Sequence, residues 1–292
     1  MPPKQRLLAI AMLIALPLLS QSAHATVATP TQKQVIDRFI ACSSFAPQFE
    51  QLPQLVRERL ESDLPQMLSS ARYKSLTTLL LDSFEADKAK NAMGQQLSLS
   101  YDNGRYRVII QKLENPLIRK LRDMEQASNE TVGRYEMQHF ISRLPHNPPP
   151  PRREALIKKL LSANGAIENA VKTQTTLHEL VQGLATSAVQ EQNRVSPNDA
   201  VEQGRRLTES LQPKLEAETL AKALYTYRSA TDEELQQYID FYNSDAGQWF
   251  RITQQNGWIG ALRNIGRDIA WKMQHPDDAE MQTALEDEEL EL

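Results

Sequence analysis

The sequence predicts an all-α protein, and three observations lead to that prediction. Glycine is scarce, with 10 residues in a chain of 292, and alternating runs of β-branched or aromatic residues are few. Leu, Ala, Glu, Gln, Lys and Arg dominate, and these residues form helices with little loss of side-chain freedom. Apolar residues recur at spacings of three and four, which is the period of an amphipathic helix.

The first 25 residues have the order of a secretory signal peptide. Lys4 and Arg6 form a basic start, an apolar run extends from Leu7 to Leu19, and Ala23-His24-Ala25 gives the small-x-small pattern that signal peptidase requires. The apolar run is too short for a stable membrane span, and no Cys follows it that could carry a lipid. We expect cleavage after Ala25 and a periplasmic or secreted mature chain. A retained anchor is the alternative.

The charge of the mature chain is concentrated at its C-terminal end. Cleavage removes Lys4 and Arg6 but no acid, so the net charge changes from −4 to −6. Residues 274–292 contain eight acids and no Lys or Arg, so the body of the chain is close to neutral. We therefore expect no nucleic-acid binding and a solvated, disordered acidic tail over residues 274–292. Binding of a basic partner or of divalent cations is the alternative for this tail.

Prolines divide the chain into two halves. Residues 144–151 end in four consecutive prolines, which favour an extended polyproline II spacer. We expect a linker at 144–151 between helical domains at 26–143 and 152–273. The alternative, a ligand for a proline-recognition module, is less suited to an exported protein. Val35–Ile40 and Leu156–Leu161 both show two apolar, two charged and two apolar residues. We interpret the halves as a diverged tandem repeat, with two unrelated helical halves as the alternative.

Local signals mark helix ends in the first half. Thr31 and Gln34 have the spacing of a capping box, in which two backbone N–H groups are satisfied reciprocally. Leu97, Leu99 and Tyr101 alternate before Asp102-Asn103-Gly104, so this segment could form either a hairpin or a helix cap. We favour the helix. The lone cysteine, Cys42, cannot form an internal disulfide and follows a helical apolar pattern. We expect it to be buried, with an intermolecular disulfide or reactive thiol as the alternative.

Similar signals mark the second half. Asn164-Gly165 ends a helix that runs from Arg152 to Ala163, because Gly adopts the left-handed cap conformation at little cost. The next apolar seam runs from Ile167 to Ala188 with Gln174 as its single polar member. Gln174 could fix the register or contact a ligand, but we favour partial exposure. Ser196 followed by Pro197 starts another helix.

The most patterned stretch extends from Thr231 to Gly247. Thr231 and Glu234 form a second capping box, and Leu235 begins an apolar face. Ser244-Asp245-Ala246-Gly247 interrupts the chain and starts the next helix, with Asp245 and Gln248 as another candidate capping box. These residue types are all explained by helix caps, a tight turn and buried aromatic rings. We therefore expect this stretch to be structural.

This stretch resembles domain-of-unknown-function family 2059, a group of exported bacterial helical proteins. The resemblance covers the second half, and the first half lacks the same elements. It implies an all-helical exported protein and no activity that can be carried over. The positions that match the family element are Thr231, Glu234, Leu235, Phe241, Tyr242, Ser244 and Gly247.

The chain shows no motif for catalysis, cofactor binding or metal binding. His178-Glu179 resembles the start of a helical zinc-protease motif, but Gln182 stands where the second His is required. We interpret His178 and Glu179 as a solvated pair. Phosphate-binding loops, nucleophile elbows and paired cysteines are missing from the sequence. We therefore expect no catalytic, cofactor or metal site.

Three functions from different classes are compatible with this sequence. The leading hypothesis is a non-catalytic binding module that presents a surface or groove to another envelope protein. The second is a carrier or chaperone for an apolar ligand, held by the Ile167–Ala188 seam with Trp249, Phe250 and Trp258. The third is a hydrolase whose acids are brought together by folding.

Overall fold

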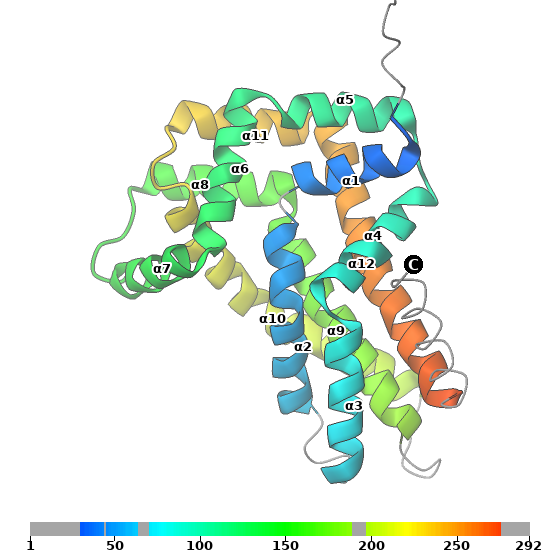
Figure 1. Cartoon of the computed structure of the whole chain (residues 1–292). Coiled ribbons are helices and arrows are strands. Elements are labelled where there is room, and N and C mark those ends of the chain that lie inside the picture. Colours follow the sequence, from blue (N-terminus) through cyan, green and yellow to red (C-terminus); the bar gives the residue numbers. More distant parts are fainter. Residues whose placement is uncertain (1–29, 44, 64–69, 189–196, 276–292) are drawn as a thin grey trace, which may run out of the picture. The chain divides into compact units, whose positions relative to one another are not determined.

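The computed structural model describes residues 30–43, 45–63, 70–188 and 197–275. These residues form twelve helices and no strand, so the all-α prediction is confirmed. Figure 1 shows the helices in chain order. They are α1 (Gln32–Cys42), α2 (Ala46–Asp63), α3 (Ser70–Ser83), α4 (Ala86–Ser98), α5 (Asn103–Leu113), α6 (Pro116–Asn129), α7 (Thr131–Arg143), α8 (Pro151–Asn164), α9 (Ala166–Ala188), α10 (Pro197–Thr226), α11 (Asp232–Asn243) and α12 (Asp245–Gln274).

The helix starts in the first half follow the local signals. Thr31 N donates to Gln34 Oε1 at 2.8 Å and Thr31 Oγ1 accepts from Gln34 N at 3.3 Å, which confirms the capping box. Asp102 Oδ1 accepts from Arg105 N at 3.0 Å and starts α5. Leu97 belongs to helix α4 and Leu99 to the turn that follows it, so the hairpin alternative is wrong. Cys42 is half-buried and packs against the core.

The helix ends in the second half are also largely as expected. Gly165 adopts a φ of 67° and ends α8, and Asn164 Oδ1 accepts from Ala166 N at 3.0 Å at the start of α9. The long helix predicted from Ile167 is α9. Helix α10 begins at Pro197, whereas Ser196 lies outside the described residues, as do residues 1–29 and 276–292.

The corner between α11 and α12 corrects one expectation. Ser244, not Asp245, caps α12: its Oγ accepts from Gly247 N at 3.2 Å, and Asp245 is the first helical residue. Gln248 Nε2 donates instead to Tyr242 O at 2.8 Å. The Asp245–Gln248 capping box is therefore wrong, because the backbone is already extended at Ser244, with ψ at 157°.

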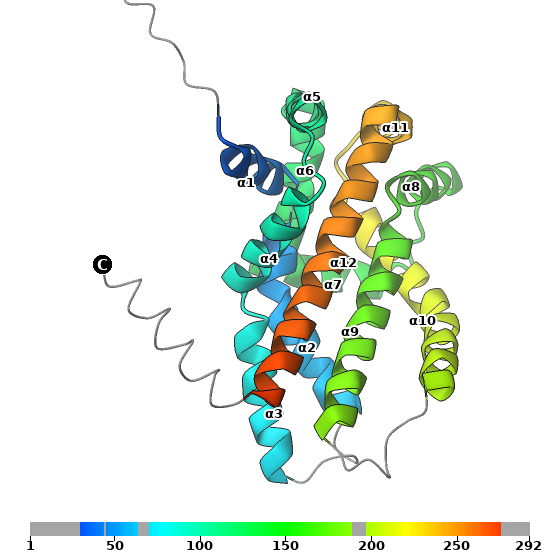
Figure 2. The ribbon, with the colours of Figure 1, turned by 90° about the vertical axis from the view of Figure 1, so that its right-hand side faces the viewer.

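Helices from both halves pack against one another. Helix α12 packs along α4 and α9, as Figure 2 shows, while α2 packs against α9 and α6 packs against α10 and α11. Nearly all buried apolar residues, from Val35 to Ile269, form one continuous cluster. The chain between α7 and α8 does not separate two cores, so the two-domain prediction is not confirmed. Pro151, placed in the predicted linker, is the first residue of α8.

The helix pairs within the two halves nevertheless correspond. Helix α1 packs against α4 and α5, as α8 packs against α10 and α11, and α2 packs against α4 as α9 does against α10. The cap Asn115 lies thirteen positions after the cap Asp102, and Ser244 lies thirteen positions after Thr231. This order is the one that a tandem repeat would give. The repeat itself stays a prediction.

Aromatic side chains of α12 hold the two halves together. The ring centroid of Trp249 lies 5.2 Å from that of Tyr106 on α5, and Phe250 lies 5.7 Å from Phe39 on α1. Trp258 lies 5.8 Å from Phe45, just before α2. Such pairs add to the stabilisation from apolar burial. Because α12 completes the core of the first half, we expect the described residues to unfold as one unit.

Candidate functional site

A cavity of about 800 Å³ lies between helices of the two halves, and we call it the central cleft. Its walls come mainly from α2, α6, α9, α10, α11 and α12. Amide side chains are the most frequent polar group on these walls. They are Gln48, Gln51, Gln126, Asn129, Asn164, Asn169, Gln174, Gln254 and Gln255.

One wall of the central cleft is a cluster of tyrosines around a carboxylate. Glu125 of α6 accepts hydrogen bonds through Oε1 from the Tyr227 hydroxyl at 2.7 Å and the Tyr238 hydroxyl at 2.9 Å. The hydroxyls of Tyr238 and Tyr242 lie 3.4 Å apart. All three tyrosines are buried. A residue of the first half therefore satisfies the buried hydroxyls of the second.

Burial controls the protonation of this cluster. It raises the pKa of Tyr227, Tyr238 and Tyr242 above the usual value for a phenol, and the adjacent Glu125 carboxylate raises all three pKa values further. The three hydroxyls are therefore neutral hydrogen-bond donors near neutral pH. They are not activated as nucleophiles or general bases.

The α9 wall presents polar side chains that are fixed by other helices. Gln174 Oε1 accepts from Arg59 Nη2 of α2 at 2.7 Å. Asn169 Oδ1 accepts from Gln255 Nε2 of α12 at 2.6 Å, and Thr173 Oγ1 accepts from the indole N–H of Trp258 at 3.0 Å. Gln174 is half-buried, so its expected partial exposure is confirmed, and its side chain faces the cleft.

Charges in the central cleft are nearly balanced. Among the residues that the structure describes, four cationic and three anionic side chains line it, which gives no strong field of either sign. They are Arg59, Arg122, Lys214 and Lys222 against Glu58, Glu125 and Glu218. The cleft is therefore suited to a ligand of low net charge.

Most residues of the Thr231–Gly247 stretch lie outside the cleft. Thr231 N donates to Glu234 Oε2 at 3.0 Å, and Thr231 Oγ1 accepts from Glu234 N at 3.1 Å, which confirms the second capping box. Leu235 and Phe241 are buried in the core, and Ser244 caps α12. Tyr242 is the one member of the matching set that lines the central cleft.

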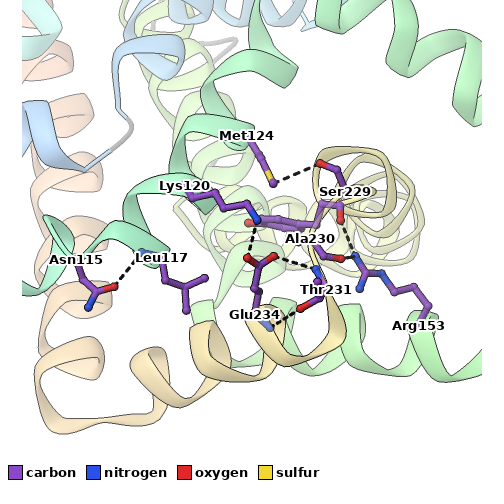
Figure 3. A network of polar contacts seen from close by, with 10 residues as sticks. Asn115, Leu117, Lys120, Met124, Arg153, Ser229, Ala230, Thr231 and Glu234 are labelled. Carbon is purple, nitrogen blue, oxygen red and sulfur yellow. Dashed lines mark hydrogen bonds and ion pairs between the residues drawn. The ribbon is translucent and has the colours of Figure 1, made fainter.

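Figure 3 shows how this stretch is tied to the rest of the chain. Glu234 Oε1 accepts from Lys120 Nζ of α6 at 2.5 Å. This bond, followed by the bond from Thr231 N, lowers the pKa of Glu234. Arg153 of α8 donates to Ala230 O at 2.8 Å and to Asp232 Oδ1 at 2.8 Å. These contacts fix the turn between α10 and α11, which carries Tyr227 into the cluster around Glu125.

The described residues hold no group of three or more His, Cys, Asp or Glu side chains that could bind a metal ion. His178 is half-buried on α9 and Glu179 beside it is exposed. None of the described helices is long and apolar enough to cross a membrane. No family model, curated protein or solved structure matches the chain. The resemblance to family 2059 therefore stays a prediction.

Removing the carboxylate of Glu125 should destabilise the fold. We expect Glu125→Ala to lower the free energy of unfolding by about 2–4 kcal/mol, because two buried hydroxyls lose their acceptor. Glu125→Gln keeps an acceptor oxygen and should cost less. Urea unfolding of residues 26–292 measures both. Asp123→Ala, which removes an exposed acid of the same helix, should stay within about 0.5 kcal/mol of the wild type. Equal stability of Glu125→Ala and Asp123→Ala would contradict the role assigned to the cluster.

Proposed function

We propose that this chain is an exported, non-catalytic binding protein that holds part of a protein partner in the central cleft. The observation that carries the proposal is the chemistry of the cleft. Its walls offer many neutral hydrogen-bonding groups, nearly balanced charge and phenols that are not activated. A surface of this kind can recognise a polar ligand but has no group poised for chemistry.

The other two functions receive less support from the cleft. A hydrolase would need an acid or base tuned for proton transfer, whereas the Glu125 carboxylate is engaged by two tyrosine hydroxyls. A carrier for apolar ligands would need exposed apolar walls. The aromatic rings at the cleft are buried, with Trp258 exposed by 5% and Phe250 by 2%. These rings serve the core, and polar side chains together with a few half-buried leucines are left to meet the ligand.

The proposal of export depends on the signal-like order of residues 1–25. The protein partner is then expected among envelope or secreted proteins. No cofactor and no nucleic acid enter the proposal.

Native mass spectrometry of protein purified gently from its producing cells tests the proposal. We expect the intact mass of a chain that begins at Thr26, without a bound small molecule, and a fraction in complex with another protein. A chain that retains residues 1–25 would contradict export. A co-purified lipid would favour the carrier, and stoichiometric metal or turnover of an envelope polymer would favour an enzyme. The lipid, metal and turnover results would each refute the proposed binding function.

A further inference from the structure

We propose that the central cleft binds an extended peptide segment, and that Asn169, Thr173 and Gln174 of α9 donate hydrogen bonds to its backbone carbonyls. The inference depends on the proposed function and specifies its ligand. All three residues are half-buried and line the cleft. They lie within about one and a half turns of one helix, so their side chains meet the same part of a ligand.

The protein itself fixes which atoms these side chains can offer. Arg only donates hydrogen bonds, so Gln174 must turn Oε1 toward Arg59, and its Nε2 is left as a donor. Lys172 donates to Gln255 Oε1 at 3.1 Å, so Gln255 must present Nε2 to Asn169. This bond occupies the oxygen of Asn169 and leaves its Nδ2 as a donor.

Thr173, like Gln174 and Asn169, accepts a hydrogen bond from the protein and keeps a donor. Its oxygen accepts from the Trp258 indole, which can only donate, and the hydroxyl proton is left to donate. Each of the three side chains therefore has its acceptor atom engaged in one hydrogen bond within the protein and at least one donor that these bonds do not use: the Nδ2 of Asn169, the hydroxyl of Thr173 and the Nε2 of Gln174. A ligand that satisfies these three donors presents a series of acceptors along α9.

The backbone of an extended peptide presents carbonyl oxygens with the required spacing. Carbonyls on one side of an extended chain repeat every two residues, about 6.6 Å apart. Asn169 and Thr173 are separated by four helical residues, a rise of about 6 Å. Successive carbonyls can therefore meet successive donors along α9.

The rest of the cleft favours a peptide over a saccharide or a lipid. The rings of Trp258, Phe45 and Phe250 are each exposed by 5% or less, so they offer no open face on which a sugar could stack. Leu55, Leu211 and Leu215 are half-buried around the cleft and can receive apolar side chains. The alkyl chain of a lipid would leave the donors of Asn169, Thr173 and Gln174 without acceptors, which is costly.

Gln174→Glu separates the donor role from a structural role. The Glu side chain has nearly the same shape, and Arg59 can still donate to it, but the second terminal atom changes from a donor to an acceptor. Asn169→Asp makes the same exchange and keeps an acceptor for Gln255. Gln237→Glu is the matched control, because Gln237 is exposed on α11 and lines no part of the cleft.

The probe is a library of random 12-residue peptides displayed on phage and selected on the chain 26–292. Selected peptides are synthesised with acetylated and amidated ends, and calorimetry measures their dissociation constants. We expect each of Gln174→Glu and Asn169→Asp to weaken binding about tenfold or more, and Gln237→Glu to have no effect. Circular dichroism melts should show all three variants folded.

The outcomes distinguish this inference from the proposed function. Peptides that bind Gln174→Glu and the wild type equally would overturn the inference. Binding of chitin oligosaccharides or fatty acids in place of peptides would overturn it as well. If no peptide binds while native mass spectrometry still finds a protein complex, the inference fails and the proposed function stands.

Discussion

Raising the pH above about 10 should unfold this protein steeply, because four tyrosines are held protonated in the fold. Burial raises the pKa of Tyr106 to about 12, and the pKa values of Tyr227, Tyr238 and Tyr242 are also raised, by burial first and by Glu125 second. In the unfolded chain these phenols ionise near pH 10. Above that pH the unfolded state binds fewer protons than the folded state, and stability falls. Below it both states are protonated, and the contribution is fully retained.

The free energy of unfolding should fall steeply with rising pH. Each tyrosine that stays protonated contributes about 1.4 kcal/mol per pH unit, so the four together cost about 5 kcal/mol per unit between roughly pH 10 and 12. Urea unfolding at a series of pH values measures the slope, and ultraviolet absorbance follows tyrosinate formation.

Two substitutions define the contribution of the buried phenols. Tyr238→Phe should reduce the slope by about a quarter. Tyr135→Phe is the control and should leave it unchanged, because Tyr135 is 76% exposed. If all eight tyrosines ionised near pH 10 without loss of structure, the buried cluster would not exist as described.

Gly247→Ala should be among the most destabilising single changes in the chain. A Cβ atom at Gly247 would lie 2.0 Å from the carbonyl oxygen of Phe241 and 2.7 Å from Tyr242 Cα. Both are backbone atoms, so the corner between α11 and α12 would have to open, which would displace Tyr242 from the cleft wall. We expect a loss of at least about 3 kcal/mol and a larger loss for Gly247→Val.

The control is a Gly→Ala substitution at a position where the added Cβ atom has no close neighbour. A Cβ at Gly94 meets no heavy atom within 4 Å, so Gly94→Ala should be neutral or stabilise α4 by up to about 1 kcal/mol. Thermal melts should use the chain 26–292, because α12 shares its core with the first half. Equal melting temperatures for Gly247→Ala and the wild type would show that the corner is not close-packed.

Local features of the fold were predictable from sequence, but packing was not. The capping boxes at Thr31 and Thr231 and the left-handed Gly165 depend on residues within one turn. The apolar stripe of α12 predicts a buried face but does not specify a partner. That face packs on α4 and α9, which belong to different halves. The prolines therefore suggest two domains by composition, but the packing of the core does not divide there.

The site was partly visible in the sequence. Gln174 stood out as the polar member of an apolar seam, because a buried polar group needs a partner or a ligand. Glu125 gave no such signal. It has the sequence context of an exposed acid on α6, and its partners Tyr227 and Tyr238 lie 102 and 113 residues further along the chain. Only folding brings them together.

Site-specific photo-crosslinking tests the binding role of the central cleft most directly. Lys222 is exposed at the cleft on α10, whereas Lys112 is exposed on α5 and lines no part of it. Replacing either by a photoreactive phenylalanine derivative removes one exposed lysine, so the two variants are matched in charge. In producing cells we expect a protein partner crosslinked through position 222, lost when Gln174→Glu is added, and none through position 112. Equal capture at both positions would contradict binding in the central cleft, whereas capture at 222 that Gln174→Glu leaves unchanged would contradict only the donor role of Gln174.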